Sequence, residues 1–264
     1  PLPPKQLRLA TGQPNSTFQV IGEQYRSFFA KQGVDLVLVS TKGAEENIEL
    51  LQNGEVDAVF SQGGLKVNDS NDTVRSLGSI SLQPLWLFYR GEEVANTENL
   101  KKFLTTRRVS LNLTGSGTRI LTDTIFKLHK IEPKSSNYVS MSSRESIDAL
   151  KDSKIDAMFL VAGVESKNLR ELLAIQGIHA FNFDLADAYT KRLRYLDEVI
   201  LPKGALEFEP ISPTKNISMV ATSVVILATN QLHPAHQLLF IEAATEFDNY
   251  RIAVFNREVR FPAY

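Results

Sequence analysis

Residues 147–163, IDALKDSKIDAMFLVAG, repeat much of residues 48–64, IELLQNGEVDAVFSQGG, at an offset of 99 positions. Over residues 46–64 the identical pairs are Glu46/Glu145, Ile48/Ile147, Leu51/Leu150, Asp57/Asp156, Ala58/Ala157, Phe60/Phe159 and Gly64/Gly163. Two amphipathic segments that resemble each other by chance are the alternative. Identity at polar as well as apolar positions favours a duplicated structural unit.

Each copy predicts a helix, a polar turn and a buried strand. In both copies an isoleucine and a leucine three residues apart share one helical face. In the second copy Ser142 and Glu145 have the spacing of a capping box, which marks a helix start. The apolar runs VDAVF and IDAMF, residues 56–60 and 155–159, suit strands covered on both faces of a parallel sheet.

The segments before each copy also correspond. Strands are predicted at 7–11 and 108–114, each followed by a Gly/Ser/Thr-rich turn and a helix, and further strands at 35–40 and 138–141. Each half therefore reads strand–turn–helix–strand–helix–strand. The predicted fold class is α/β, with two α/β lobes, a cleft between them and a hinge of two connecting segments.

The rest of the chain predicts how the lobes are joined. Residues 84–91, PLWLFYRG, predict a strand that leaves the first lobe, and the tail carries an apolar strand at 221–229 and a helix at 234–250. We expect the tail to return to the first lobe. Lobe I would then comprise 1–88 plus about 218–264, and lobe II about 89–217.

Composition excludes several classes of function. Lys+Arg 29 against Asp+Glu 30 gives no electrostatic footprint for nucleic acid. The chain has no cysteine, which excludes thiolate catalysis, disulfides and cysteine metal sites. No run of apolar residues is long enough to span a membrane. The opening PLPPK resembles a linker, so a removed signal peptide or membrane anchor is compatible with it.

The two strand-to-helix turns are the predicted binding site. Open α/β sheets bind ligands at the carboxyl edge of their strands, where helix starts present free amides to negative groups. Hydroxyl and amide side chains surround both turns, and these are Asn15, Ser16, Thr17, Thr114, Ser116 and Thr118. We predict a site for a small anion, most simply a carboxylate. The alternative is that these residues only cap helices.

Two cations adjoin these turns, and both have alternative roles. Arg119 either pairs with a ligand carboxylate or points outward from its helix, and Lys42 either faces the cleft or lies on solvated surface. The segment GSGTR, residues 115–119, lacks the spacing of a nucleotide-binding P-loop.

No catalytic, cofactor or metal site is predicted. His233 and His236 lie three apart, but Pro234 separates them and no third ligand is evident. Asp57 and Asp156 occupy matching places in the repeat, either as an acid/base pair or as residues that end the turn before each buried strand. No nucleophile motif is present.

The segments LRLATGQPNSTFQVIG, NGEVDAVFSQGG, GSGTR and SIDALKDSKIDAMFLVAGV resemble the TAXI solute-binding proteins over roughly residues 7–250. These are TRAP-transporter-associated extracytoplasmic proteins, a branch of the type II periplasmic binding proteins. The resemblance implies two lobes that close on a small organic acid, such as an amino acid. It also implies a location in the periplasm or elsewhere outside the cytoplasm, and TRAP membrane subunits as partners. A monomer is the default expectation for a binding protein that closes at a hinge.

The positions that would face the ligand follow from this resemblance and the turns. They are Gly12, Asn15, Ser16, Thr17, Phe18, Gly43, Asn47, Ser61, Gln62, Ser116, Gly117, Thr118, Arg119, Val161 and Gly163. The chain departs from the family at the first turn, where Phe18 and Gln19 replace a tyrosine pair and Pro14 stiffens the backbone. The family's glutamate therefore does not carry over as the solute.

Two other functions compete with solute delivery. The same lobes could form the ligand-sensing domain of a membrane-anchored signalling protein. An enzyme is the third class. The related thiamine-precursor synthases depend on a cysteine-rich motif, which this chain lacks, and a dehydratase or transferase stays open but has no acid/base set to support it. We therefore expect a binding protein rather than an enzyme.

Overall fold

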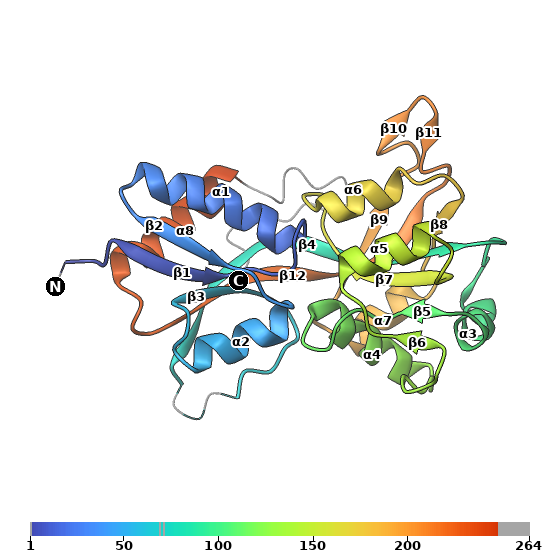
Figure 1. Ribbon diagram of the computed structural model, residues 1–264, viewed down its shortest axis with the longest axis horizontal. Coiled ribbons are helices and arrows are strands. Elements are labelled where there is room, and N and C mark those ends of the chain that lie inside the picture. Colours follow the sequence, from blue (N-terminus) through green and yellow to red (C-terminus); the bar gives the residue numbers. More distant parts are fainter. Residues whose placement is uncertain (1, 69, 71, 248–264) are drawn as a thin grey trace.

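The protein, in a computed structural model that describes residues 2–68, 70 and 72–247, consists of two α/β lobes joined by two long strands (Figure 1). The strands follow one another in the order β2-β1-β3-β12-β4-β7-β5-β6, with β8 added to β4 and β9 to β12. This arrangement confirms the predicted α/β fold class.

One lobe forms around three parallel strands. They are β1 (Gln6–Ala10), β2 (Asp35–Val39) and β3 (Ala58–Gln62). Helices α1 (Thr17–Lys31) and α8 (Pro234–Phe247) cover one face of this sheet and α2 (Ala44–Gln52) covers the other (Figure 1). The predicted helix at 234–250 is confirmed to Phe247, and its last residues lie outside the described part of the chain.

The other lobe repeats this plan around a second parallel set. Its strands are β5 (Val109–Ser110), β6 (Tyr138–Val139) and β7 (Ala157–Val161), and its corresponding helices are α4 (Gly117–Leu128) and α5 (Ser143–Lys151). Strand β5 is shorter than the predicted 108–114, because the chain leaves the ladder after Leu111, whose N–H still donates to the carbonyl of Val139, and then forms the turn before α4. Ser142 and Glu145 form the predicted capping box.

Several elements of this lobe were not predicted. They are α3 (Thr97–Thr106), α6 (Lys167–Leu173), β8 (Ile178–Ala180), α7 (Ala186–Arg192), β9 (Asp197–Leu201), β10 (Glu207–Phe208) and β11 (Ile211–Ser212). None belongs to the repeat, which explains why the alignment of the two copies gave no signal for them.

The two aspartates of the repeat have the same structural role. Asp57 accepts a hydrogen bond from the backbone N–H of Arg8 at 2.7 Å, and Asp156 accepts one from that of Arg108 at 2.9 Å. Each aspartate N–H also donates to the carbonyl of the same arginine. They therefore join the end of each helix-to-strand turn to the first strand of its lobe. This geometry favours the turn-ending alternative over an acid/base pair.

Strands β4 (Val74–Arg90) and β12 (Ile217–Thr229) carry the chain between the lobes. Residues 74–84 of β4 pair with β12, and residues 85–89 pair with β7 in the other lobe. Strand β12 pairs with β9 over residues 217–221 and with β3 over 224–228. The predicted boundaries at 88 and about 218 fall inside these strands, so the division into residue ranges stays a prediction.

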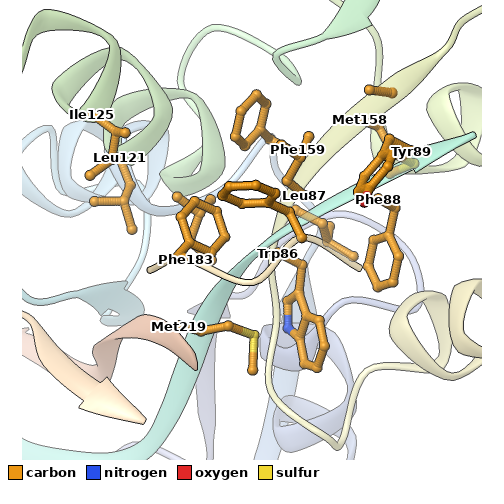
Figure 2. Packing of buried hydrophobic residues seen from close by; sticks show 14 of the residues in the cluster. Trp86, Leu87, Phe88, Tyr89, Leu121, Ile125, Met158, Phe159, Phe183 and Met219 are labelled. Atoms are coloured by element: carbon orange, nitrogen blue, oxygen red, sulfur yellow. The ribbon is translucent and has the colours of Figure 1, made fainter. Parts of the chain in front are cut away.

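Residues 85–89 of β4 form the centre of the larger core, because they are covered on both faces. Figure 2 shows Trp86 and Phe88 projecting from this strand, with Phe159 of β7 and Met219 of β12 nearby. The rings of Trp86 and Phe88 stack at 5.5 Å, and the indole N–H donates to the carbonyl of Ala162 at 2.9 Å. No helix among the described residues is long and apolar enough to cross a membrane.

Trp86→Phe should lower the free energy of unfolding by about 1–3 kcal/mol, because it reduces a buried ring and leaves the Ala162 carbonyl without its donor. Urea unfolding followed by circular dichroism measures this change. Phe208→Leu is the control: Phe208 is 80% exposed and its replacement should change the free energy by less than about 0.5 kcal/mol. Equal effects of the two substitutions would contradict the placement of Trp86 at the centre of the core.

Candidate functional site: a cavity between the two lobes

A small cavity lies where the two lobes meet. Its volume is about 50 Å³, and both strand-to-helix turns contribute to its wall. Ten of the predicted ligand-facing residues line it: Gly12, Ser16, Thr17, Phe18, Gly43, Gln62, Ser116, Gly117, Thr118 and Val161. Residues 100 positions apart in the chain are therefore brought to one place, as the cleft prediction requires.

Helices α1 and α4 begin at this cavity from opposite lobes. Ser16 caps α1 by accepting the N–H of Gln19 at 3.2 Å, and Ser116 caps α4 by accepting the N–H of Arg119 at 3.1 Å. Within the described part of the chain no group accepts a hydrogen bond from the backbone amides of Thr17, Phe18, Gly117 and Thr118. All four residues are buried and line the cavity.

These amides make the cavity favourable for a negative group. Unpaired amides at a helix start and the helix dipole both attract an anion, and here two helices of fifteen and twelve residues contribute together. Lys42 also lines the cavity, and no described carboxylate pairs with its amino group. No aspartate or glutamate is among the lining residues. The electrostatics therefore suit a small anion.

The threonine hydroxyls of the two helix starts hold the loop after β7. Thr17 accepts the N–H of Gly163 at 2.8 Å across the cleft, and Thr118 accepts the N–H of Val161 at 2.9 Å. Both hydroxyls thus position backbone at the cavity wall. This pairing explains why Gly163, predicted to face the ligand, lies behind the wall instead.

Four further predicted residues also lie outside the wall, because their polar groups serve the fold. Asn47 is fully buried and donates to the carbonyls of Thr11 and Phe60 at 2.6 and 2.7 Å. Ser61 donates to the carbonyl of Ala44 at 3.2 Å. The carbonyl of Asn15 accepts the hydroxyl of Ser166 across the cleft at 3.0 Å.

Arg119 is the fourth of these residues. Its Nε lies 3.0 and 3.2 Å from the two carboxylate oxygens of Asp123, one turn further along α4. The guanidinium is therefore held on its own helix by an i,i+4 ion pair. The geometry favours the outward-pointing alternative over a contact with a ligand.

Two glutamines, Gln13 and Gln62, form hydrogen bonds between the lobes that were not predicted from the sequence. Gln13 donates to the carbonyl of Lys42 and to the side-chain oxygen of Asn112, each at 3.0 Å, and accepts the N–H of Ser143 at 2.7 Å. Gln62 donates to the carbonyl of Gly117 at 3.0 Å. Both line the cavity, and of the two only Gln62 belongs to the predicted set. The other lining residues absent from that set are Lys42, Ala44, Gln83, Ser143, Leu160, Ala162 and Ser166. Contacts such as Gln13 with Ser143 join distant turns, so no local sequence pattern signals them.

Close approach of the lobes requires glycine at Gly43. Its φ of +138° is a conformation that residues with side chains rarely adopt, and a Cβ there would lie 3.2 Å from the Cα of Ser116. The start of α2 thereby reaches the turn before α4, where the N–H groups of Glu45 and Glu46 donate to the carbonyl of Gly115. A larger residue at 43 would separate the lobes.

Residues 2–68, 70 and 72–247 show no metal site. Among the described residues, no group of three or more histidine, aspartate or glutamate side chains could hold a metal ion. His233 and His236 lie near the start of α8, and Nδ1 of His233 accepts the N–H of Ala235 at 3.1 Å.

The comparisons with known proteins agree with this architecture. The sequence profile of the NMT1-like family matches residues 9–246. The chain belongs to the NMT1-like family. Its fold is the type II periplasmic-binding-like fold of two α/β lobes.

Solved structures of other proteins share the fold of this NMT1-like chain. The effector-binding domain of BenM with its effector benzoate is 12% identical, with a TM-score of 0.56 and 93% of each chain covered. The regulatory domain of CcmR from Synechocystis PCC6803, in complex with 2-PG, is 14% identical, with a TM-score of 0.58 and coverage of 92% and 97%. Full-length BenM is 13% identical, with a TM-score of 0.57 and coverage of 92% of this chain and 67% of BenM.

A buried carboxyl lies beside the lobe contact and was missed by the sequence analysis. Glu165, in the loop between β7 and α6, is 5% exposed and accepts the hydroxyl of Ser81 on β4 at 2.9 Å. Its other oxygen has no hydrogen-bond partner among the described residues. Burial raises the pKa of this carboxyl above its usual range, opposed by its own backbone N–H, by Ser81 and by the charge of Arg170.

Glu165→Gln should stabilise the NMT1-like chain at pH 8. Because the folded-state pKa of Glu165 is raised, folding favours the protonated form. The protonated carboxyl of Glu165 therefore stabilises the fold at pH values below the usual carboxyl pKa of about 4.3. This stabilisation is lost as the pH rises through the folded-state pKa. The advantage of the variant over the parent should therefore grow from pH 4.5 to pH 8.

Urea unfolding at several pH values measures this difference, and groups common to both proteins cancel from it. Glu207→Gln, on the exposed hairpin far from the lobe contact, makes the same chemical change and is the matched control. A pH-independent difference for Glu165→Gln would show that the carboxyl is not held protonated by the fold.

Proposed function

We propose that this chain binds a small organic acid in the cavity between its lobes and that the lobes close around the acid by bending at β4 and β12. The observation that carries this proposal is that four buried residues with unpaired amides, at the starts of α1 and α4, line one cavity between the lobes. The absence of carboxylates among the lining residues and the presence of Lys42 support a negatively charged ligand.

The acid is delivered to a TRAP-type membrane transporter, and the protein acts as a monomer outside the cytoplasm. The support for this part is the resemblance of GSGTR and NGEVDAVFSQGG to the TAXI solute-binding proteins. No catalytic step is part of the proposal, because closure alone is enough to capture a solute. A ligand recovered chemically unchanged after prolonged incubation is the expected result.

The alternative function is ligand sensing within a membrane-anchored signalling protein. The specific observation that favours it is the likeness to an effector-binding domain and to a regulatory domain, one bound to benzoate and the other to 2-PG. Both functions need the same binding step. Uptake of the bound acid by vesicles that contain TRAP membrane subunits, dependent on this protein, would support delivery; binding without uptake would support sensing.

Thermal unfolding tests the binding step. A refolded sample is screened against amino acids, dicarboxylates, 2-oxo acids and monocarboxylates, with amines as the control set. An acid at ~100 times its dissociation constant should stabilise the protein by about 2.7 kcal/mol, which raises Tm by several degrees. Stabilisation by amines alone, or by no acid at all in a correctly refolded sample, would contradict the proposal.

Lys42→Gln should weaken binding of any acid found in this screen by about 3- to 10-fold, because it removes the cation that lines the cavity. The dependence of the dissociation constant on salt should also become shallower. Isothermal titration at two salt concentrations measures both. Lys31→Gln, at the exposed end of α1, makes the same charge change away from the cavity and should leave the affinity unaltered.

A further inference from the structure

Gln62 stands at the boundary between the two lobes. It ends β3 of the first lobe, is 5% exposed, and its amide group crosses the cleft to the carbonyl of Gly117 in the first turn of α4. Both residues line the cavity. The carboxamide thus forms the part of the cavity wall that lies against one of the two anion-favouring helix starts.

The place that the Gln62 amide occupies exists only because residue 117 is glycine. A Cβ on Gly117 would lie 2.0 Å from Oε1 and 2.6 Å from Cδ of Gln62, far inside van der Waals contact. The φ of Gly117 is not positive, so the backbone itself would accept alanine. The side chain of Gln62 is therefore the group that would have to move.

The cavity that remains is small. A single water needs roughly 10–15 Å³ of such space, so the volume of about 50 Å³ accepts roughly four water-sized groups. Gln13 closes the wall towards α5 through its hydrogen bond with Ser143, which fixes a second side of the cavity. An acid that carries a long or branched body does not fit between these two amides.

We propose that Gln62 sets the size of the ligand: it restricts this cavity to short acids of one to about three carbons, and its removal admits longer ones. The proposal rests on the proposed binding of organic acids and specifies their class. The Gln62 carboxamide is hydrogen-bonded to Gly117, so it is a direct neighbour of a carboxylate held on the amides of Gly117 and Thr118 in the same cavity. The length of this one side chain therefore determines how many atoms can follow the carboxylate.

The test is a chain-length series. Formate, acetate, propionate, butyrate, hexanoate and octanoate, together with L-glutamate, are compared as sodium salts at 50 mM, against sodium chloride at the same concentration. In the parent protein, Tm should rise by ~4 °C or more with the best of the three shortest acids and by less than ~1 °C with hexanoate, octanoate or glutamate.

Gln62→Ala should move the largest rise in Tm to butyrate or hexanoate, because it clears a carboxamide and a methylene group from the wall. Gly117→Ala displaces the same amide, so it should weaken the response to acetate in the parent but add little in the Gln62→Ala background. Gln52→Ala is the matched control: its amide contacts the carbonyl of Asn68 on exposed surface, and its chain-length profile should equal that of the parent.

The outcomes separate this proposal from the one it rests on. If no acid stabilises either the parent or Gln62→Ala, organic-acid binding itself is wrong. If acids bind but the parent prefers hexanoate or glutamate to acetate, or if Gln62→Ala keeps the parent's chain-length profile, only the role of Gln62 is overturned. A general loss of stability in the variant changes the starting Tm but not the order of the acids, so a merely structural role would leave that order unmoved.

Discussion

The pairing of β4 with β12 is the interaction on which the rest of the structure depends. Residues 221–229 of β12 pair with residues 74–84 of β4. The parallel strands of one lobe join β12 through β3, and those of the other lobe join β4 through β7. They fix how the carboxyl edges of the two sheets face one another. The starts of α1 and α4 meet at one cavity because both lobes are attached to this shared pair.

Much of the fold could be predicted because the repeat supplied two independent copies of the same local signals. Asp57 and Asp156, Ser142 with Glu145, and the buried runs after each turn are all short-range patterns. The unpredicted elements, such as α3 and the β10–β11 hairpin, belong to one lobe only. Their positions follow from packing on the second sheet, which a single sequence does not reveal.

The site could be predicted only as far as it is local. The turns at residues 12–18 and 115–118 are marked by glycine and hydroxyl residues, and most of their members line the cavity. Asn47 and Arg119 carry suitable chemistry, but a buried network and an ion pair with Asp123 occupy them. Gln62 was predicted to face the ligand and Gln13 was not, but no motif signals the bond that either glutamine makes to a backbone group of the opposite lobe.

The two crossings of the chain also bear on the order in which the protein folds. The first three strands leave the ribosome early, yet their sheet is completed by β12 and covered by α8, which lie near the end of the described chain. The central elements β5 to β9 are contiguous and finish earlier. During synthesis the middle of the chain can therefore become compact first. Until β12 is made, the edge of β3 stays unpaired, and it can bind other chains in aggregates or be bound by chaperones.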